Sequence, residues 1–207
     1  MNNKALITTN SSSLVVLEKS KNLLAITDEI LQSRNRRISD DSWIYELWDW
    51  ADANVVPDYG YVKTEYWELC EGLPRTKEKL LSITKLFLNG NQLINLPDSI
   101  GNLNKITELR LGGNKLIGLP ESIGDLTQLS GLLLNDNYLV NLPDSIGKLT
   151  QLTQFYLNNN HLTNLPESII NLTQLTELQL DSDKIAFTPK QTKWIEQLKN
   201  KGCDVQL

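Results

Sequence analysis

The residues that could do chemistry in this sequence are few and scattered. The single histidine is His161, and the sequence assigns it no serine or cysteine partner for triad catalysis. Asp181-Ser182-Asp183 offers carboxylates for calcium but lacks the further ligands of an EF-hand loop. Glycine-rich phosphate loops and the zinc-site patterns HExxH and CxxC do not occur. We therefore expect a protein that is not an enzyme and that has no metal or cofactor.

The charge balance narrows the class of partner. The 207 residues include 20 lysines and arginines against 25 aspartates and glutamates, which gives a net charge of −5. A nucleic-acid backbone or an anionic membrane is bound by a basic surface. Neither is therefore expected as a partner.

The two cysteines and the N-terminal residues indicate the cellular compartment of the protein. Cys70 and Cys203 have no spacing that supports a disulfide, so two buried, reduced thiols are the simpler interpretation, although their redox state stays open. Residues 1–24 lack the apolar core of a secretory leader, and no run approaches the roughly 18 apolar residues of a membrane span. The sequence predicts a cytoplasmic protein.

A repeat of 23 residues organises the rest of the chain, and its nine-letter signature first appears as NLPDSIGNL at 95–103. Several columns of residues keep this interval. They include Pro97, Pro120, Pro143, Pro166 and Pro189; Leu88, Leu111, Leu134, Leu157 and Leu180; and Asn91, Asn114, Asn137 and Asn160, with Asp183 as the expected last member.

Each repeat contains a short strand followed by a turn. In the unit 106–128 the first part alternates apolar and polar residues, which predicts a strand. The second part has apolar residues three and four apart, which favours a helical or 3₁₀ turn opened by Pro120. Gly124 would allow a tight bend and a close approach to the next coil. One unit cannot bury its own leucines, so the units must stack into a solenoid.

The asparagine column has two interpretations. A buried polar side chain must be hydrogen-bonded, and one asparagine per coil can pair with backbone groups where the strand ends. The alternative is a ladder of polar ligands for a bound molecule. We favour the structural interpretation.

The repeat pattern L-x-x-L-x-L-x-x-N-x-L-x-x-L-P-x-S-I-G-x-L resembles the leucine-rich repeat over residues 83–187. Its 23-residue period with LPxSIG is similar to the Ras-suppressor-like class of intracellular repeats, which is also common in bacterial proteins. The resemblance implies an α/β fold, a curved right-handed solenoid with a parallel sheet on its concave side.

The sequence indicates three segments: an N-terminal cap at 1–72, repeats at 73–187 and a C-terminal cap at 188–207. The repeats would comprise a half repeat, four full units and the start of a fifth. The C-terminal cap should be a helix with an apolar stripe at Trp194, Ile195 and Leu198, followed by a short strand.

The N-terminal cap is expected to be helical and rich in tryptophan. We expect helices at 13–33 and over DDSWIYELWDWADA, and we favour a helix over a strand for YVKTEYWELC. We favour core packing for the tryptophans of this cap, with a binding hot spot as the alternative. These tryptophans are Trp43, Trp48, Trp50 and Trp67.

The outward residues of the repeat differ at every rung, whereas the framework columns hardly change. Such variation is typical of a recognition surface, and a solvated sheet with drifted residues is the alternative. We expect a monomer that binds an unknown protein or peptide on its concave face, or else a structural protein that self-associates through the Trp-rich cap. The predicted binding residues are Phe87, Glu108, Arg110, Leu133, Gln154, Tyr156, Tyr138, His161 and Gln179.

Overall fold

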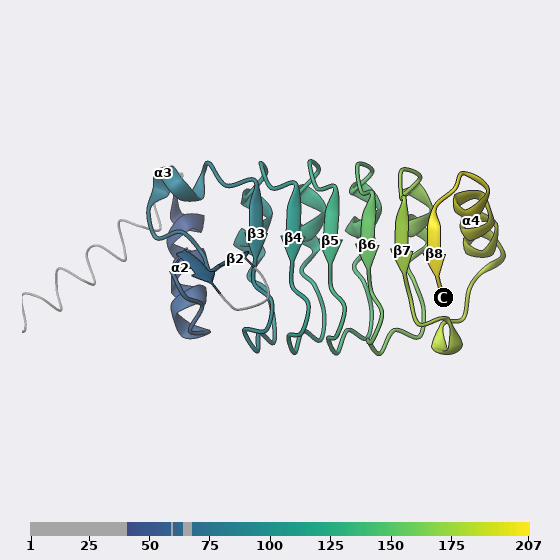
Figure 1. The fold of residues 1–207 in the computed structure, drawn as a ribbon, viewed down its shortest axis with the longest axis horizontal. Coiled ribbons are helices and arrows are strands. Elements are labelled where there is room, and N and C mark those ends of the chain that lie inside the picture. The colour runs from purple at the N-terminus through teal and green to yellow at the C-terminus, as the bar shows by residue number, and fades with distance from the viewer. Residues whose placement is uncertain (1–40, 59, 64–67) are drawn as a thin grey trace, which may run out of the picture. The chain divides into compact units, whose positions relative to one another are not determined.

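Figure 1 shows the computed structural model of the chain, which describes residues 41–58, 60–63 and 68–207. Its contacts divide the chain into Met1–Ser42 and Trp43–Leu207, and the second unit holds the repeats. The helix expected at 13–33 lies outside the described residues. In the described part, no helix is both long and apolar enough to cross a membrane.

The described strands form one sheet in sequence order from β1 to β8. β1 and β2 pair antiparallel, and every later neighbour is parallel. This order is the one expected when each repeat adds a rung to the last. The bounds are β1 Gly60–Lys63, β2 Glu68–Glu71, β3 Lys85–Phe87, β4 Glu108–Arg110, β5 Gly131–Leu133, β6 Gln154–Tyr156, β7 Glu177–Gln179 and β8 Asp204–Gln206.

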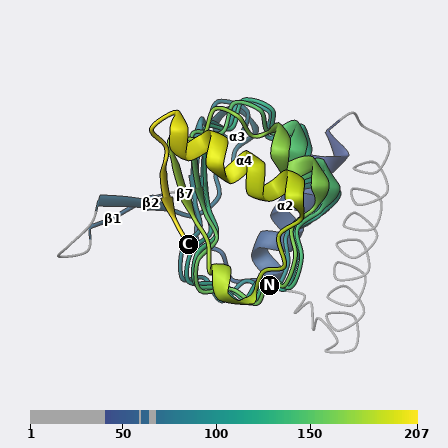
Figure 2. The same cartoon turned by 90° about the vertical axis from the view of Figure 1, so that its right-hand side faces the viewer.

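A 3₁₀ turn stands opposite the strand in each full repeat, as Figure 2 shows in the view along the solenoid. The four turns are η1 Asp98–Asn102, η2 Glu121–Asp125, η3 Asp144–Lys148 and η4 Glu167–Asn171. A proline precedes each turn in an extended conformation, as at Pro120 with φ −70° and ψ 153°. Proline loses nothing there, because the first N–H of a helical turn has no partner within the turn. The predicted solenoid is confirmed.

The core lies between the sheet and the 3₁₀ turns. The leucine column from Leu88 to Leu180 is at most 3% exposed, and the second buried position of each strand is filled by a leucine or by Phe155. Each coil contributes the same apolar positions, so the core runs without a break from repeat to repeat.

The asparagine column satisfies backbone groups between coils, which confirms the structural interpretation. Asn137 Oδ1 accepts a hydrogen bond from the Leu116 N–H at 3.0 Å. Its Nδ2 donates to the carbonyls of Leu111 at 2.9 Å and Leu134 at 3.0 Å. Asn114 makes the same three bonds one coil earlier.

The column ends at Asn160, so the expectation that Asp183 would complete it is wrong. Asp183 is exposed in the short turn η5 (Ser182–Lys184). The chain changes course there toward the C-terminal helix. Asp181 instead accepts a hydrogen bond from the backbone N–H of Asn160 at 3.2 Å.

Glycine and serine let the coils approach closely on the side of the 3₁₀ turns. A Cβ atom placed on Gly124 would lie 2.5 Å from the Ser145 carbonyl oxygen, and Gly101 and Gly147 have equivalent neighbours. No real Cβ tolerates such a contact, so glycine is required there. In the last full repeat Ile170 takes the place of glycine and packs against the core, because α4 (Pro189–Asn200) replaces the next turn.

Helix α2 (Ser42–Ala53) contributes to the same core from the N-terminal side. Ile44, Leu47 and Ala51 are buried, as expected for one face of this helix. Trp43, Trp48 and Trp50 are partly buried and pack against the core. Trp67 lies outside the described residues.

The half repeat follows α2 with buried leucines at Leu73 and Leu80, the second at the end of the single-turn helix α3 (Lys77–Leu80). Trp48 Nε1 donates to the carbonyl of Pro74 at 2.8 Å and so joins α2 to this half repeat. The division at residues 72 and 73 stays a prediction.

The expectation of a helix over residues 61–70 is wrong for 61–63 and 68–70, which belong to the strands β1 and β2, and residues 64–67 lie outside the described residues. Valine and aromatic residues favour strands, and β2 pairs with β3 at Glu71 and Phe87. The pairing gives partners to a strand edge that the first repeat would otherwise leave open. The described part of the N-terminal segment is therefore a helix and a hairpin rather than helices alone.

At the other end, α4 lies across the last coil (Figure 2). Thr188 and Gln191 form a reciprocal capping box at its start. Trp194 is 3% exposed and donates through Nε1 to the Leu172 carbonyl at 3.1 Å. Gly202, with φ +88°, turns the chain back into β8 beside β7.

Candidate protein-binding surface

The concave face is the outward surface of β3 to β8, formed by the first and third residues of these strands. Parallel pairing in register places them in two columns across the sheet. The first column is Lys85, Glu108, Gly131, Gln154, Glu177 and Asp204; the second is Phe87, Arg110, Leu133, Tyr156, Gln179 and Gln206.

A charged cluster occupies the face at β3 and β4. Arg110 contacts Glu108 Oε1 through Nε at 2.6 Å and through Nη2 at 2.5 Å, and Lys85 Nζ reaches Glu108 Oε2 at 2.8 Å. The guanidinium lies 4.5 Å from the centre of the Phe87 ring, a cation–π contact. Partial burial disfavours the Glu108 carboxylate, but the hydrogen bonds and charges of the two cations outweigh it and lower its pKa.

A hydrogen-bonded cluster occupies the face at β6 and β7. The Tyr156 hydroxyl donates to Glu177 Oε2, and Gln154 Nε2 donates to Glu177 Oε1 at 3.0 Å. The bond to Glu177 favours the protonated phenol and, with partial burial, raises the pKa of Tyr156 to about 12. The same bond lowers the pKa of Glu177. Both side chains are thereby fixed in orientation.

A hollow of about 730 Å³ lies between these clusters. Leu133 contributes to its lining, with Arg110 and Tyr156 from the neighbouring strands. Gly112 and Gly113 also line it and add no side chains. The hollow therefore combines the apolar Leu133 side chain with polar groups, which include Asn135 and Asp136 of the same repeat, an arrangement that can take a partner's side chain.

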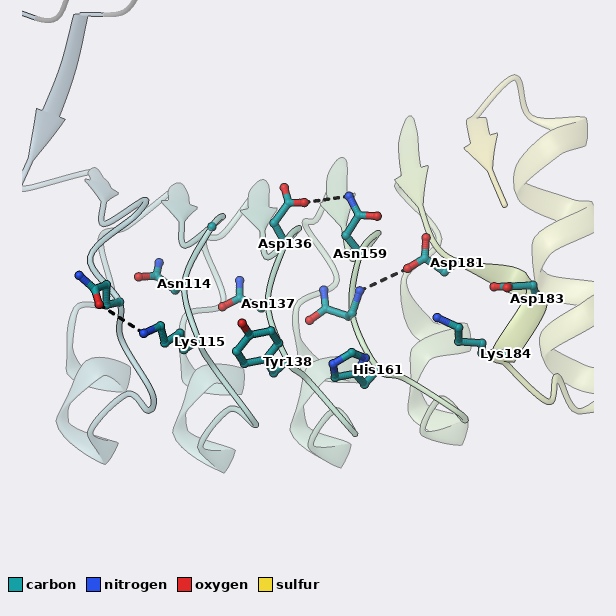
Figure 3. Close-up of a pocket in the computed structure, with 13 residues that line it drawn as sticks. Asn114, Lys115, Asp136, Asn137, Tyr138, Asn159, His161, Asp181, Asp183 and Lys184 are labelled. Atoms are coloured by element: carbon teal, nitrogen blue, oxygen red, sulfur yellow. Dashed lines mark hydrogen bonds between the residues drawn. The ribbon is translucent and has the colours of Figure 1, made fainter.

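Tyr138 and His161 belong to a second hollow, of about 640 Å³, at the loops that follow the strands (Figure 3). Their rings stack 5.7 Å apart with an angle of 4° between the planes. On the two preceding rungs, Lys115 Nζ donates to Gln92 Oε1 at 3.3 Å. The structure thus places seven of the nine predicted residues on the concave face and these two at its loop edge.

Sequence reasoning missed two features of this surface. Asp204 lies beside Glu177 in the first column, although the α4 insertion removes it from the 23-residue period. A row of apolar side chains, Ile94, Ile117 and Val140, is 54%, 59% and 51% exposed beside the loop edge. The period places these three residues in one column, so this signal was present in the sequence.

The remaining reactive groups form no site in the described part of the chain. No group of three or more histidine, cysteine, aspartate or glutamate side chains is placed there to hold a metal ion. Cys203 is a buried thiol without a disulfide, and burial raises its pKa. His161 is exposed, and its ring stacks on the ring of Tyr138.

Comparisons with known families agree with the architecture. Two family models, both described as leucine-rich repeat, match residues 82–103 and 127–185. Over these residues the solenoid matches the leucine-rich-repeat models. Leucine-rich-repeat domains are typically protein–protein interaction modules. A comparison with the curated proteins found no match.

Solved leucine-rich-repeat structures are similar over about half of the chain. A protein of Leptospira interrogans is 35% identical over 57% of this chain and 30% of its own, with a TM-score of 0.53. InlJ of Listeria monocytogenes is 30% identical over 56% of this chain and 25% of its own, with a TM-score of 0.47.

The ectodomain of the receptor kinase GASSHO1/SCHENGEN3 of Arabidopsis thaliana, solved in complex with CASPARIAN STRIP INTEGRITY FACTOR 2, is 35% identical over 49% of this chain and 13% of its own, with a TM-score of 0.43. This chain thus matches only part of each of these proteins, and less than a third of the length of the Leptospira protein.

Proposed function

We propose that this chain is a non-enzymatic binding module that recognises a protein or peptide on its concave face. The observation that carries the proposal is that the buried residues are nearly the same in each repeat, whereas the residues on the concave face differ. Buried leucines and asparagines repeat at each rung, whereas the outward column runs Phe87, Arg110, Leu133, Tyr156 and Gln179. Aromatic and arginine side chains are those that most often carry binding energy in interfaces.

The order of these side chains also supports the proposal. Arg110 is fixed by Glu108 and by the Phe87 ring, and Tyr156 is fixed by Glu177. Side chains that are already ordered lose less conformational entropy on binding. The hollow at Leu133 separates these two fixed groups.

The finer expectations from the sequence remain part of this proposal and rest on the sequence alone. They are the 23-residue LPxSIG class, a bacterial source, a cytoplasmic location and a monomeric state.

The alternative, self-association through the Trp-rich cap, has less support. Trp43, Trp48 and Trp50 already pack against the core. Sedimentation over a range of protein concentrations tests it directly. A monomer at all concentrations would exclude self-association of the free chain.

The function is tested with Leu133→Arg, which fills the hollow with a charged side chain. Gln128→Arg is the matched control, because Gln128 lies five positions before Leu133, is exposed and lies outside the concave face. Partners captured from an extract of the source cells are quantified for both variants and the wild type, after their melting temperatures are compared. We expect a partner retained by wild type and Gln128→Arg and lost roughly tenfold by Leu133→Arg. Equal retention by all three would place the binding surface elsewhere.

A further inference from the structure

Two carboxylates stand side by side on the concave face at its C-terminal end. Glu177 of β7 and Asp204 of β8 are direct partners in the parallel register. Like charges on directly opposed strand positions repel. Within the described residues no lysine or arginine forms an ion pair with either of them. Glu177 is held by neutral donors, Tyr156 and Gln154.

The cations of the face lie at the other end. Among its described side chains, the two basic groups are Lys85 on β3 and Arg110 on β4. Both pair with the single carboxylate of Glu108. The Arg110 side chain is 35% exposed, and only its Nε and Nη2 contact Glu108, so N–H donors remain for a further acceptor.

The middle rung carries no charged or polar side chain in the two columns. β5 presents Gly131 in the first column and Leu133 in the second. A Cβ atom on Gly131 would meet the Glu108 and Gln154 side chains at 3.4 and 3.6 Å, ordinary contact distances, so packing does not demand glycine here. The three zones therefore follow one another across the strands as basic, apolar and acidic.

We propose that the occupant of this face is an extended peptide segment that crosses the strands and carries an acidic, an apolar and a basic side chain in that spatial order. The acidic group would lie at Arg110, the apolar group in the hollow at Leu133, and the basic group at Glu177 and Asp204. This inference rests on the proposed function and names the chemistry of its partner.

The spacing of the rungs fixes the spacing of these side chains. Neighbouring strands are roughly 4.8 Å apart, so β4 and β7 are separated by about 14 Å. An extended peptide advances about 3.3 Å per residue, and its alternate side chains share one face. The two charged residues should therefore stand four positions apart, with the apolar residue two positions from the acidic one, which is the position on the same face of the peptide nearest to β5.

The test is selection from a displayed library of random peptides on the full chain. Three variants accompany the wild type: Glu177→Lys with Asp204→Lys, Glu177→Gln with Asp204→Asn, and the control Asp98→Lys with Glu196→Lys. The control changes the net charge equally at exposed acids outside the concave face. Melting temperatures establish that each variant is folded.

We expect the wild type and the control to enrich peptides with opposite charges on either side of an apolar residue. The lysine variant should enrich acidic residues at both ends and bind the wild-type peptides roughly tenfold more weakly. The amide variant, which keeps polar groups at both positions, should lose the preference for a basic residue without reversing it.

The outcomes separate the inference from the proposed function. Enriched peptides that Leu133→Arg abolishes, but that show no charge order or none that the lysine variant changes, would overturn the inference and leave the function standing. Failure to enrich any peptide that depends on Leu133 would overturn the inference alone, because the capture experiment with Leu133→Arg tests the proposed function separately.

Discussion

At the scale of single residues, the asparagine column shows how one buried polar side chain can hold two coils together. Asn137 is 2% exposed; its Oδ1 accepts a hydrogen bond from one N–H and its Nδ2 donates to three carbonyl groups. These backbone groups belong to the segments that follow the strands. An apolar residue of the same size would fill the space but would leave these groups without the bonds to Asn137.

We therefore predict that Asn137→Ala lowers the free energy of unfolding by about 3 kcal/mol, because buried backbone groups lose their hydrogen bonds. Urea denaturation measures the change. Asn141→Ala is the control, since Asn141 is exposed in the same repeat, and it should change the value by no more than about 0.5 kcal/mol. Equal effects of the two substitutions would contradict this account of the column.

The Tyr156–Glu177 bond gives a second prediction at this scale, which concerns pH. The pKa of Glu177 is lowered in the folded protein, so its contribution is present at neutral pH and is lost as the pH falls through that pKa. The pKa of Tyr156 is raised from 10.0 to about 12, so its contribution is present below pH 10 and is lost as the pH rises through about 12.

The unfolding free energies of wild type and Tyr156→Phe should therefore differ most between the pKa of Glu177 and the pKa of Tyr156. They should converge at lower and at higher pH. In Glu177→Gln the titration of Tyr156 should return toward pH 10, the ordinary value of a tyrosine. Tyrosine absorbance followed against pH measures it. An unchanged titration in Glu177→Gln would mean that Glu177 does not cause the shift.

At the scale of elements, the 3₁₀ turns determine how closely the coils stack. The proline of LPxSIG starts each turn, and its glycine meets the serine of the next turn without room for a methyl group. Ile170 stands at the glycine position in the one turn that is followed by a helix. The requirement for glycine therefore comes from the neighbouring coil and not from the turn itself.

Gly124→Ala should accordingly destabilise the protein by about 2 kcal/mol, because its methyl group would meet the Ser145 backbone. Gly118→Ala is the matched control in the same repeat, since nothing lies within 4 Å of a Cβ there. We expect it to be neutral or slightly stabilising through the unfolded chain. Thermal unfolding of both variants measures the difference, and a neutral Gly124→Ala would refute the close-contact argument.

At the scale of the whole molecule, the repeats make most neighbours predictable. In a solenoid each coil contacts the coils before and after it, so a residue meets the residues 23 positions away. Reading the period along the chain therefore predicts the leucine core, the strand register, the 3₁₀ turns and the hydrogen-bonding role of the asparagines. The same reading places Phe87, Arg110, Leu133 and Tyr156 in one column.

The prediction failed where the period ends. Residues 60–63 and 68–71 pair as strands because β3 offers β2 a strand edge, a tertiary partner that local propensity does not reveal. Asp183 leaves the asparagine column because the chain turns there toward α4. Both errors concern contacts that occur once in the chain.

The sequence by itself determined the solenoid, because a strict period fixes both which residues are buried and which ones stack. Only the tertiary structure decided the chemistry of the concave face. It joined Lys85 and Arg110 to Glu108, placed Asp204 beside Glu177 and separated the Tyr138–His161 pair from the hollow at Leu133. Side-chain conformations and the α4 insertion decide these contacts, and neither can be predicted from the 23-residue repeat.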